Sequence, residues 1–201
     1  MKVYGITGGA GTGKSEVIKM LQENFGGCVI MSDEVARELM QKGNISYQLI
    51  VEYFGRDILM DDGEIDRKKL ADHVFNNKEA LEKLNSMTHP YVKNEIRKLI
   101  AEAEASGECR FVALESAILL ECGYEDICDE FWYVYTKPEI RRQRMKETRN
   151  YSDEKVDSVM RNQQPDEVFF EQCSFVIENN TTLSDVYDQL KEKLDQQLMH
   201  E

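Results

Sequence analysis

The sequence has little that would place the protein in a membrane, outside the cell or in a metal site. The sequence has 201 residues and no apolar run long enough to span a membrane. Its first residues, MKVYGITGG, lack the pattern of a signal peptide. The five cysteines are odd in number and include no CxxC pair, which argues against a zinc site and a disulfide framework. We therefore expect a cytoplasmic protein with reduced thiols.

Positive charge is also scarce along the chain. There are 25 Lys and Arg residues against 38 Asp and Glu residues, and the formal net charge is −13. Such a surface disfavours a nucleic-acid partner and suits a soluble enzyme. We expect no nucleic-acid partner, no membrane partner and no obligate protein partner. The length suits one α/β domain with inserted lobes.

Five short apolar stretches alternate with segments that have the spacing of amphipathic helices. The stretches are rich in Val, Ile, Phe and Tyr, which favour β-strands. They are Lys2–Ile6, Cys28–Met31, Arg110–Ser116, Phe131–Tyr135 and Ser174–Glu178. This alternation predicts an α/β fold with a five-stranded, mostly parallel sheet that helices cover on both faces, in three layers.

The helices have readable start signals. Ser32 and Asp33 precede a predicted helix over Glu34–Met40, and Asp66 and Ser152 are expected to cap two later helices. The mostly helical span 41–106 is long for a crossover between strands. We interpret it as an inserted lobe, the part of an α/β enzyme that often holds a second substrate.

Residues 8–15 read GGAGTGKS and match the phosphate-binding pattern G-x-x-x-x-G-K-[ST] between a predicted strand and a predicted helix. Glycines let backbone N–H groups turn toward phosphates, and the start of the helix adds its positive dipole end. Lys14 is expected to reach the β- and γ-phosphates, and Ser15 to ligate Mg²⁺. The expected ligands are therefore ATP and Mg²⁺, and the activity is that of a kinase. The predicted nucleotide-binding residues are Gly8, Gly9, Gly11, Thr12, Gly13, Lys14, Ser15 and, through its backbone N–H, Glu16.

Two acidic residues follow predicted strands, at the edge where open α/β sheets bind ligands. Asp33 follows the second strand, where it either accepts the proton of an acceptor hydroxyl as a general base or caps the next helix. Glu115 ends the third strand, where it either holds a magnesium-bound water or is simply a polar residue at the junction of strand and loop.

One basic segment stands out in this acidic chain. Lys137–Arg149 reads KPEIRRQRMKETR and holds six basic and two acidic residues. Guanidinium groups suit phosphate oxygens and the charge that develops during phosphoryl transfer. The segment is either a mobile lid over the nucleotide or a solvated helix with ion pairs along one face.

Taken together, these segments resemble the dephospho-CoA kinase family, over nearly the whole chain. The series DGxIDRxxL…VF…HP is the specific part, because a generic nucleotide kinase does not carry it. The matching segments are TGGAGTGKS (Thr7–Ser15), SDEVAR (Ser32–Arg37), YFG (Tyr53–Gly55), DGEIDRKKLADHVF (Asp62–Phe75), THP (Thr88–Pro90), ILLECG (Ile118–Gly123), RNQQ (Arg161–Gln164) and IENN (Ile177–Asn180).

The resemblance implies ATP-dependent phosphorylation of the ribose 3′-hydroxyl of dephospho-CoA, with dephospho-CoA as the substrate and partner. It implies a single kinase domain over 1–201, in which a P-loop core comprises 1–40, 107–136 and 165–201. A helical acceptor-binding lobe would span about 41–106, and a lid about 137–164. The resemblance also assigns roles to single residues: Asp33 as general base, Arg37 and His89 on the acceptor side, Arg144 and Arg149 as catalytic lid arginines, and Asn179 near the ATP base.

The sequence departs from the family pattern in four places. These are Glu16, Met31, Ala117 and the spacing of Arg149, and none of them removes the phosphate loop or Asp33. Read without the family, His89 precedes a proline, and its backbone is therefore expected to be extended.

Two other hypotheses stay open. One is another small-molecule or nucleotide P-loop kinase, and the other is a nucleotide-binding protein without turnover. A GTPase switch lacks support, since the sequence has no NKxD motif.

Overall fold

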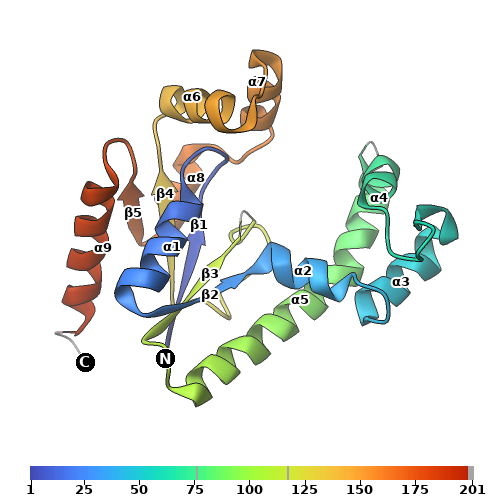
Figure 1. Cartoon of the computed structure of the whole chain (residues 1–201), viewed down its shortest axis with the longest axis horizontal. Coiled ribbons are helices and arrows are strands. Elements are labelled where there is room, and N and C mark those ends of the chain that lie inside the picture. The colour runs from blue at the N-terminus through green and yellow to red at the C-terminus, as the bar shows by residue number, and fades with distance from the viewer. Residues whose placement is uncertain (76, 117, 199–201) are drawn as a thin grey trace. The chain divides into compact units, whose positions relative to one another are not determined.

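The computed structural model describes residues 1–75, 77–116 and 118–198, so Ala117 lies outside the described residues. The chain divides into two compact units, which we describe separately. The first comprises Met1–Val29 and Ala103–Glu201, and the second is Ile30–Glu102. The second unit is thus inserted into the first (Figure 1).

A five-stranded sheet forms the centre of the first unit. Its strand order is β2-β3-β1-β4-β5, and the described pairs β1·β3, β1·β4 and β4·β5 are all parallel. The predicted fold class is confirmed, and each strand lies within one residue of its predicted bounds. The strands are β1 (Lys2–Thr7), β2 (Gly27–Met31), β3 (Phe111–Glu115), β4 (Glu130–Tyr135) and β5 (Phe175–Glu178).

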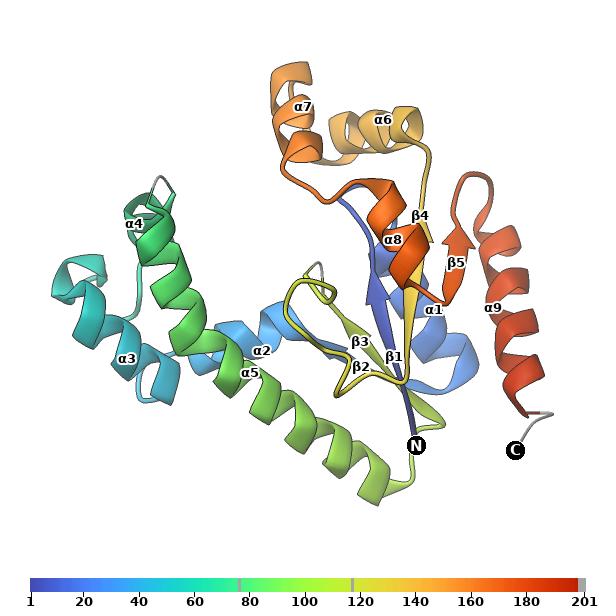
Figure 2. The ribbon, with the colours of Figure 1, turned by 180° about the vertical axis from the view of Figure 1, so that it is seen from behind.

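Helices cover both faces of this sheet. On one face α1 (Lys14–Phe25) contacts β1, β3 and α9 (Leu183–Leu198), with Phe25 stacked on Tyr187. On the other face α8 (Asp166–Gln172) packs on β4, where the rings of Phe169 and Tyr133 stack with centroids 4.7 Å apart. Figure 2, seen from behind, brings α8 in front of the sheet and puts α1 at its back. The central strands supply completely buried apolar side chains, among them Ile6, Leu114 and Trp132. This apolar packing anchors the strand ends that carry the functional loops.

Two further helices follow β4. They are α6 (Pro138–Arg149) and α7 (Asp153–Arg161), and they contact each other. Pro138 occupies the first helical position, where its missing N–H costs nothing, and Ser152 caps α7 by accepting the N–H of Lys155 as expected. Arg142 of α6 forms ion pairs with Asp153 and Asp157 of α7.

The second unit is helical. Its elements are α2 (Ser32–Leu39), α3 (Ile45–Phe54), the 3-10 turn η1 (Arg56–Ile58), α4 (Arg67–Val74) and α5 (Lys78–Ser106), whose last residues belong to the first unit. A small core of Ile50, Ile58, Ile65 and Leu70 holds α3, η1 and α4 together. Asp66 caps α4 by accepting the N–H groups of Lys68 and Lys69, as predicted.

Two expectations about this unit are wrong. Ser32 and Asp33 do not precede α2 but form its first turn, because the helix begins directly after β2 with Met31 as its N-cap. The backbone at His89 is helical, since α5 runs from Lys78 to Ser106 with Pro90 inside it. Proline removes one hydrogen bond from a helix interior, and the rest of this long helix outweighs that local cost.

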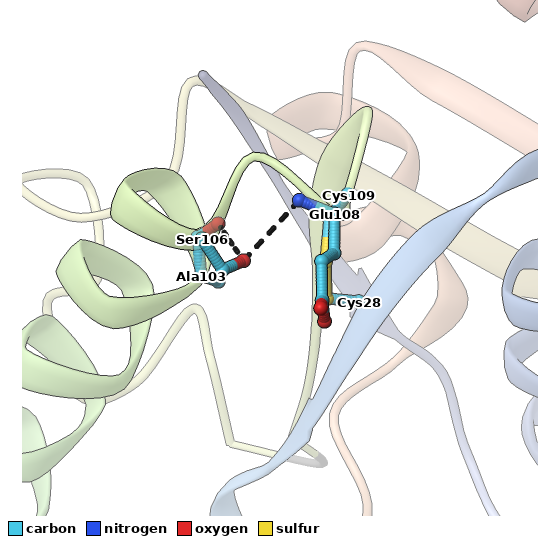
Figure 3. The surroundings of a disulfide bond; sticks show 5 residues. All are labelled: Cys28, Ala103, Ser106, Glu108 and Cys109. Carbon is cyan, nitrogen blue, oxygen red and sulfur yellow. Dashed lines mark hydrogen bonds between the residues drawn. A yellow bond between two sulfur atoms is a disulfide. The ribbon is translucent and has the colours of Figure 1, made fainter.

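The prediction of reduced thiols is wrong for two of the five cysteines. Cys28 in β2 forms a disulfide with Cys109, with their Cα atoms 5.5 Å apart (Figure 3). Cys109 follows a turn in which Ser106 Oγ donates to the Ala103 carbonyl and accepts the N–H of Glu108. The two cysteines are 81 positions apart and meet only because β2 and β3 are neighbours. Burial raises the pKa of the Cys173 thiol to about 12, so it stays protonated at neutral pH.

Candidate nucleotide-binding site

The phosphate loop lies where the sequence places it, between β1 and α1. The turn needs glycine at two positions in particular. Gly13, the N-cap of α1, has φ 87°, and a Cβ there would overlap the side-chain amide of Asn179. Gly11 has φ 78°, and its Cβ would lie 2.9 Å from the carbonyl oxygen of Arg141. A side chain at either position is strained and sterically blocked.

Donors from the loop and from α1 bind three of the loop's carbonyl groups. Lys14 Nζ donates to the Gly8 oxygen at 2.6 Å, and Thr12 Oγ1 donates to the Gly9 oxygen at 2.9 Å. The Gly13 oxygen accepts the backbone N–H of Glu16 at 3.1 Å as α1 begins. These hydrogen bonds therefore hold the first and the last residues of the loop in place.

Three side chains from other elements converge on the carbonyl of Thr12. Asn179 Nδ2 donates to it at 2.8 Å, Thr136 Oγ1 at 3.0 Å and Arg144 Nη1 at 3.4 Å. Asn179 follows β5, Thr136 follows β4, and Arg144 lies in α6. Thr12 and Thr136 are completely buried, so water does not reach their part of this polar cluster. Hydrogen bonds are electrostatically stronger in such surroundings than in water.

The carbonyl of Ala10 also has a donor from outside the loop, the Arg141 Nε group at 3.1 Å. In a trans peptide the carbonyl and the following N–H point in opposite directions, and the described residues include no cis bond. The N–H groups of Gly11 and Gly13 therefore point away from the donors that hold the carbonyls of Ala10 and Thr12. Backbone N–H groups presented in this way at the start of a helix can bind a phosphate.

An ion pair joins the lysine of the loop to an acidic residue at the end of a strand. Lys14 Nζ lies 3.8 Å from Glu115 Oε1, and Glu115 is 8% exposed at the end of β3. The sequence predicted both residues at this edge of the sheet, and the structure brings them together. Ser15 and Glu16 follow in the first turn of α1 with exposed side chains.

The two predicted lid arginines differ in their surroundings. Arg144 contacts the loop and also donates from Nη2 to the Asn179 carbonyl at 3.1 Å. Arg149, the last residue of α6, is exposed, and its guanidinium lies 6.0 Å from the ring centroid of Tyr151. Asn179, predicted near the nucleotide base, binds the loop backbone and is 3% exposed.

The remaining predicted residues belong to the second unit. Asp33 and Arg37 are one turn apart on α2, and both are exposed. Asp33 is not the N-cap of its helix, which removes the capping alternative for this residue. His89 is half-buried in α5. Burial is the main cause that lowers the pKa of its imidazole, and the positive charge of Lys93 is the second.

Sequence reasoning missed the contacts of Thr136, Arg141, Gln163 and Asp166 around the loop. The sequence places Arg141 in the basic segment, three positions before Arg144 and so on the same helical face, but gave it no role of its own. That spacing is the signal that could have found it. Within the described ranges, the structure has no cluster of three His, Cys, Asp or Glu side chains that could hold a metal ion alone. No helix in those ranges combines the length and apolarity of a membrane span.

Comparison with known proteins identifies a family. The family model described as dephospho-CoA kinase matches residues 2–185. A dephospho-CoA kinase of Carboxydothermus hydrogenoformans is 36% identical over 190 residues, covering 94% of this chain and 91% of the relative. A dephospho-CoA kinase of Bacillus licheniformis is 38% identical over 194 residues, covering 96% and 95%.

A solved structure agrees with this result. The crystal structure of TT1252 from Thermus thermophilus superposes with a TM-score of 0.80 at 29% sequence identity. The superposition covers 97% of each chain. Sequence and fold thus point to relatives of nearly the same length.

Proposed function

Because the chain belongs to the dephospho-CoA kinase family, we propose that it transfers the γ-phosphoryl group of ATP to the ribose 3′-hydroxyl of dephospho-CoA. The products are CoA and ADP, and the reaction is the last step of CoA biosynthesis. The observation that carries the proposal is the family match over residues 2–185. Further support comes from a phosphate loop whose Ala10 and Thr12 carbonyls accept hydrogen bonds from Arg141 and Asn179.

The loop supplies the phosphate-binding part of the reaction. Its backbone N–H groups and the N-terminus of α1 bind the β- and γ-phosphates. Lys14 moves its ammonium from the Gly8 carbonyl and the Glu115 carboxylate to the phosphate oxygens, and so offsets the charge that builds as the bond to the leaving oxygen breaks.

The residues at the strand ends fit a magnesium ion that accompanies ATP. Ser15 offers a hydroxyl in the first turn of α1, and Glu115 offers a carboxylate beside Lys14. Hard oxygen ligands of this kind suit Mg²⁺, which keeps several waters and binds mainly through the nucleotide's phosphates. When bound, the ion neutralises part of the phosphate charge.

Asp33 accepts the proton of the acceptor hydroxyl in this proposal. Support comes from its match to the SDEVAR segment of the family and from its place directly after β2, free of a capping role. Arg37, one turn later, and His89 bind the acceptor, and Arg144 and Arg149 act from the lid. The span 41–106 is the acceptor-binding lobe and the span 137–164 the lid.

The test is ADP release by the purified chain with ATP and Mg²⁺. Parallel reactions contain dephospho-CoA, AMP, adenosine or no acceptor. The proposal expects release that depends on dephospho-CoA, with a product of the mass of CoA. Release of ADP only with another acceptor would support a kinase activity but refute dephospho-CoA as the acceptor. No release despite ATP binding would refute catalysis.

A second test addresses the base. Asp33→Asn is expected to bind ATP as the wild type does and to lose most turnover, because the amide cannot take up the proton. Glu34→Gln, the adjacent exposed acid of α2, is the matched control and should keep its turnover. Turnover near the wild-type rate in Asp33→Asn would refute the assignment.

A further inference from the structure

Arg141 of α6 is a buried cation bound directly to the phosphate loop. Its side chain is only 6% exposed. The guanidinium donates from Nε to the Ala10 carbonyl at 3.1 Å, from Nη1 to Asp166 Oδ1 at 3.4 Å, and from Nη2 to Gln163 Oε1. The planar guanidinium thus bridges the loop to the start of α8 and the segment before it.

The loop is shaped to admit this side chain. A Cβ at Gly9 would overlap both Arg141 Nη2 and Gln163 Oε1. At Gly11 a Cβ would lie 2.9 Å from the Arg141 carbonyl and 3.2 Å from Met145 Cγ. Two of the loop's glycines therefore make room for α6 and its partners.

The partners of the guanidinium are themselves held in place. Asp166 Oδ1 also accepts the hydroxyl of Tyr133 at 2.7 Å, and Tyr133 is fully buried in β4. Burial is the main cause that raises the pKa of Tyr133 far above its usual value, and the hydrogen bond to Asp166 is the next. The phenol therefore keeps its proton and stays a donor. Burying a charged group costs free energy unless its hydrogen bonds and its charge are satisfied. Here the carboxylate of Asp166 partly compensates the charge of the Arg141 guanidinium.

We propose that Arg141 is a positioning residue, which turns the Ala10–Gly11 peptide so that the Gly11 N–H faces the phosphates of the nucleotide. Asp166 and Gln163 orient the guanidinium, and Nε holds the Ala10 carbonyl. Because the peptide is trans, fixing that carbonyl fixes the N–H of Gly11 on its opposite side. The inference rests on the proposed function only in taking the loop to bind the phosphates of ATP.

The proposal predicts that loss of Arg141 affects ligands with phosphate groups and spares a ligand without them. Without Arg141 the Gly11 N–H is no longer aimed, so affinity for ATP and ADP falls. Affinity for adenosine, which has no phosphate, does not. Lysine cannot replace arginine here, because one ammonium on a flexible stem cannot reproduce the planar fork that reaches three acceptors.

The experiment compares Arg141→Met, Arg141→Lys and Asp166→Asn with the wild type, by isothermal titration with ATP, ADP and adenosine in the absence of acceptor. Melting temperatures show that each variant is folded. Arg142→Met is the matched control, since its guanidinium pairs with α7 and not with the loop. For Arg141→Met we expect about a tenfold weaker affinity for ATP, the loss of one charged hydrogen bond, with adenosine affinity unchanged.

The variants cover one another. If Arg141→Met fails to fold, Arg141→Lys carries the test, and we expect weaker ATP binding from a folded protein. Asp166→Asn should weaken ATP binding less, because the loop contact itself remains. Unchanged ATP affinity in a folded Arg141 variant would overturn the proposal. So would an equal loss for ATP and adenosine, or the same loss in Arg142→Met.

The design also distinguishes this inference from the proposed function. Binding of ATP is measured without dephospho-CoA, so a wrong acceptor would leave the result for Arg141 intact. Conversely, a wild type that phosphorylates dephospho-CoA while Arg141→Met binds ATP normally would keep the function and discard only the positioning role. With acceptor present, the Arg141→Lys variant should show a raised KM for ATP and an unchanged KM for dephospho-CoA.

Discussion

Replacing Thr136 with valine removes one hydroxyl from the polar cluster that holds the carbonyl of Thr12. Thr136 Oγ1 lies 3.0 Å from that carbonyl and 3.1 Å from the carbonyl of Asn179. A hydroxyl has one hydrogen, so it donates to only one of the two oxygens at a time. Valine keeps the shape of threonine and loses this donor. It also loses an acceptor 3.4 Å from Arg144 Nη1, which still has the Thr12 carbonyl as a partner.

The magnitude follows from what remains. The Thr12 carbonyl still accepts from Asn179 Nδ2, and the Asn179 carbonyl still accepts from Arg144 Nη2. Neither oxygen is left without a partner, so the cost is that of one ordinary hydrogen bond, about 1 kcal/mol. For a chain of this size the melting temperature should fall by about 2–4 °C. ATP affinity should fall less than about tenfold, the factor that 1.4 kcal/mol would give.

The assay is thermal unfolding together with titration of ATP, on Thr136→Val and on Thr136→Ser. Serine keeps the donor and loses the methyl group, so it should keep ATP affinity. Two results would refute the reasoning. One is a valine variant that matches the wild type in both measurements. The other is a loss above about 3 kcal/mol, which would mean that a buried carbonyl has been left unpaired.

Three further predictions concern the core, the metal and pH. Met145→Ala should destabilise the protein by about 2–5 kcal/mol in urea unfolding, because this fully buried side chain packs beside Gly11. Glu115→Gln should raise the Mg²⁺ concentration needed for half-maximal activity about tenfold at fixed ATP, if it holds a magnesium-bound water; an unchanged requirement would contradict that role. His89, whose folded pKa is below 6.5, takes up its proton more readily in the unfolded chain, so stability should fall as pH drops below 6.5. His89→Gln should lose less stability over that range, as urea unfolding at two pH values will show.

Local patterns were enough to predict the strands and the phosphate loop. Short runs rich in β-branched and aromatic residues gave all five strands, and GGAGTGKS between strand and helix located the loop. These features depend on neighbours in sequence, which a single chain displays directly.

What failed depends on residues far apart in the chain. Cys28 and Cys109 meet because of the strand order, and no local signal encodes it. Pro90 lies inside α5 because the long helix overrides the local preference of the residue before it. The rotation of α6 about its own axis decides that Arg141 is buried against the loop while Arg149 is exposed, and packing sets that rotation.

The disulfide has a consequence for the covalent topology of the chain. Cys28 and Cys109 bracket residues 29–108, so the bond closes a covalent ring that contains the whole second unit. A protease that cuts once within this ring opens it without releasing a fragment. Such a nicked chain would migrate as one species on a denaturing gel without reductant and as two after reduction. Limited proteolysis therefore reports both the bond and the place of the cut.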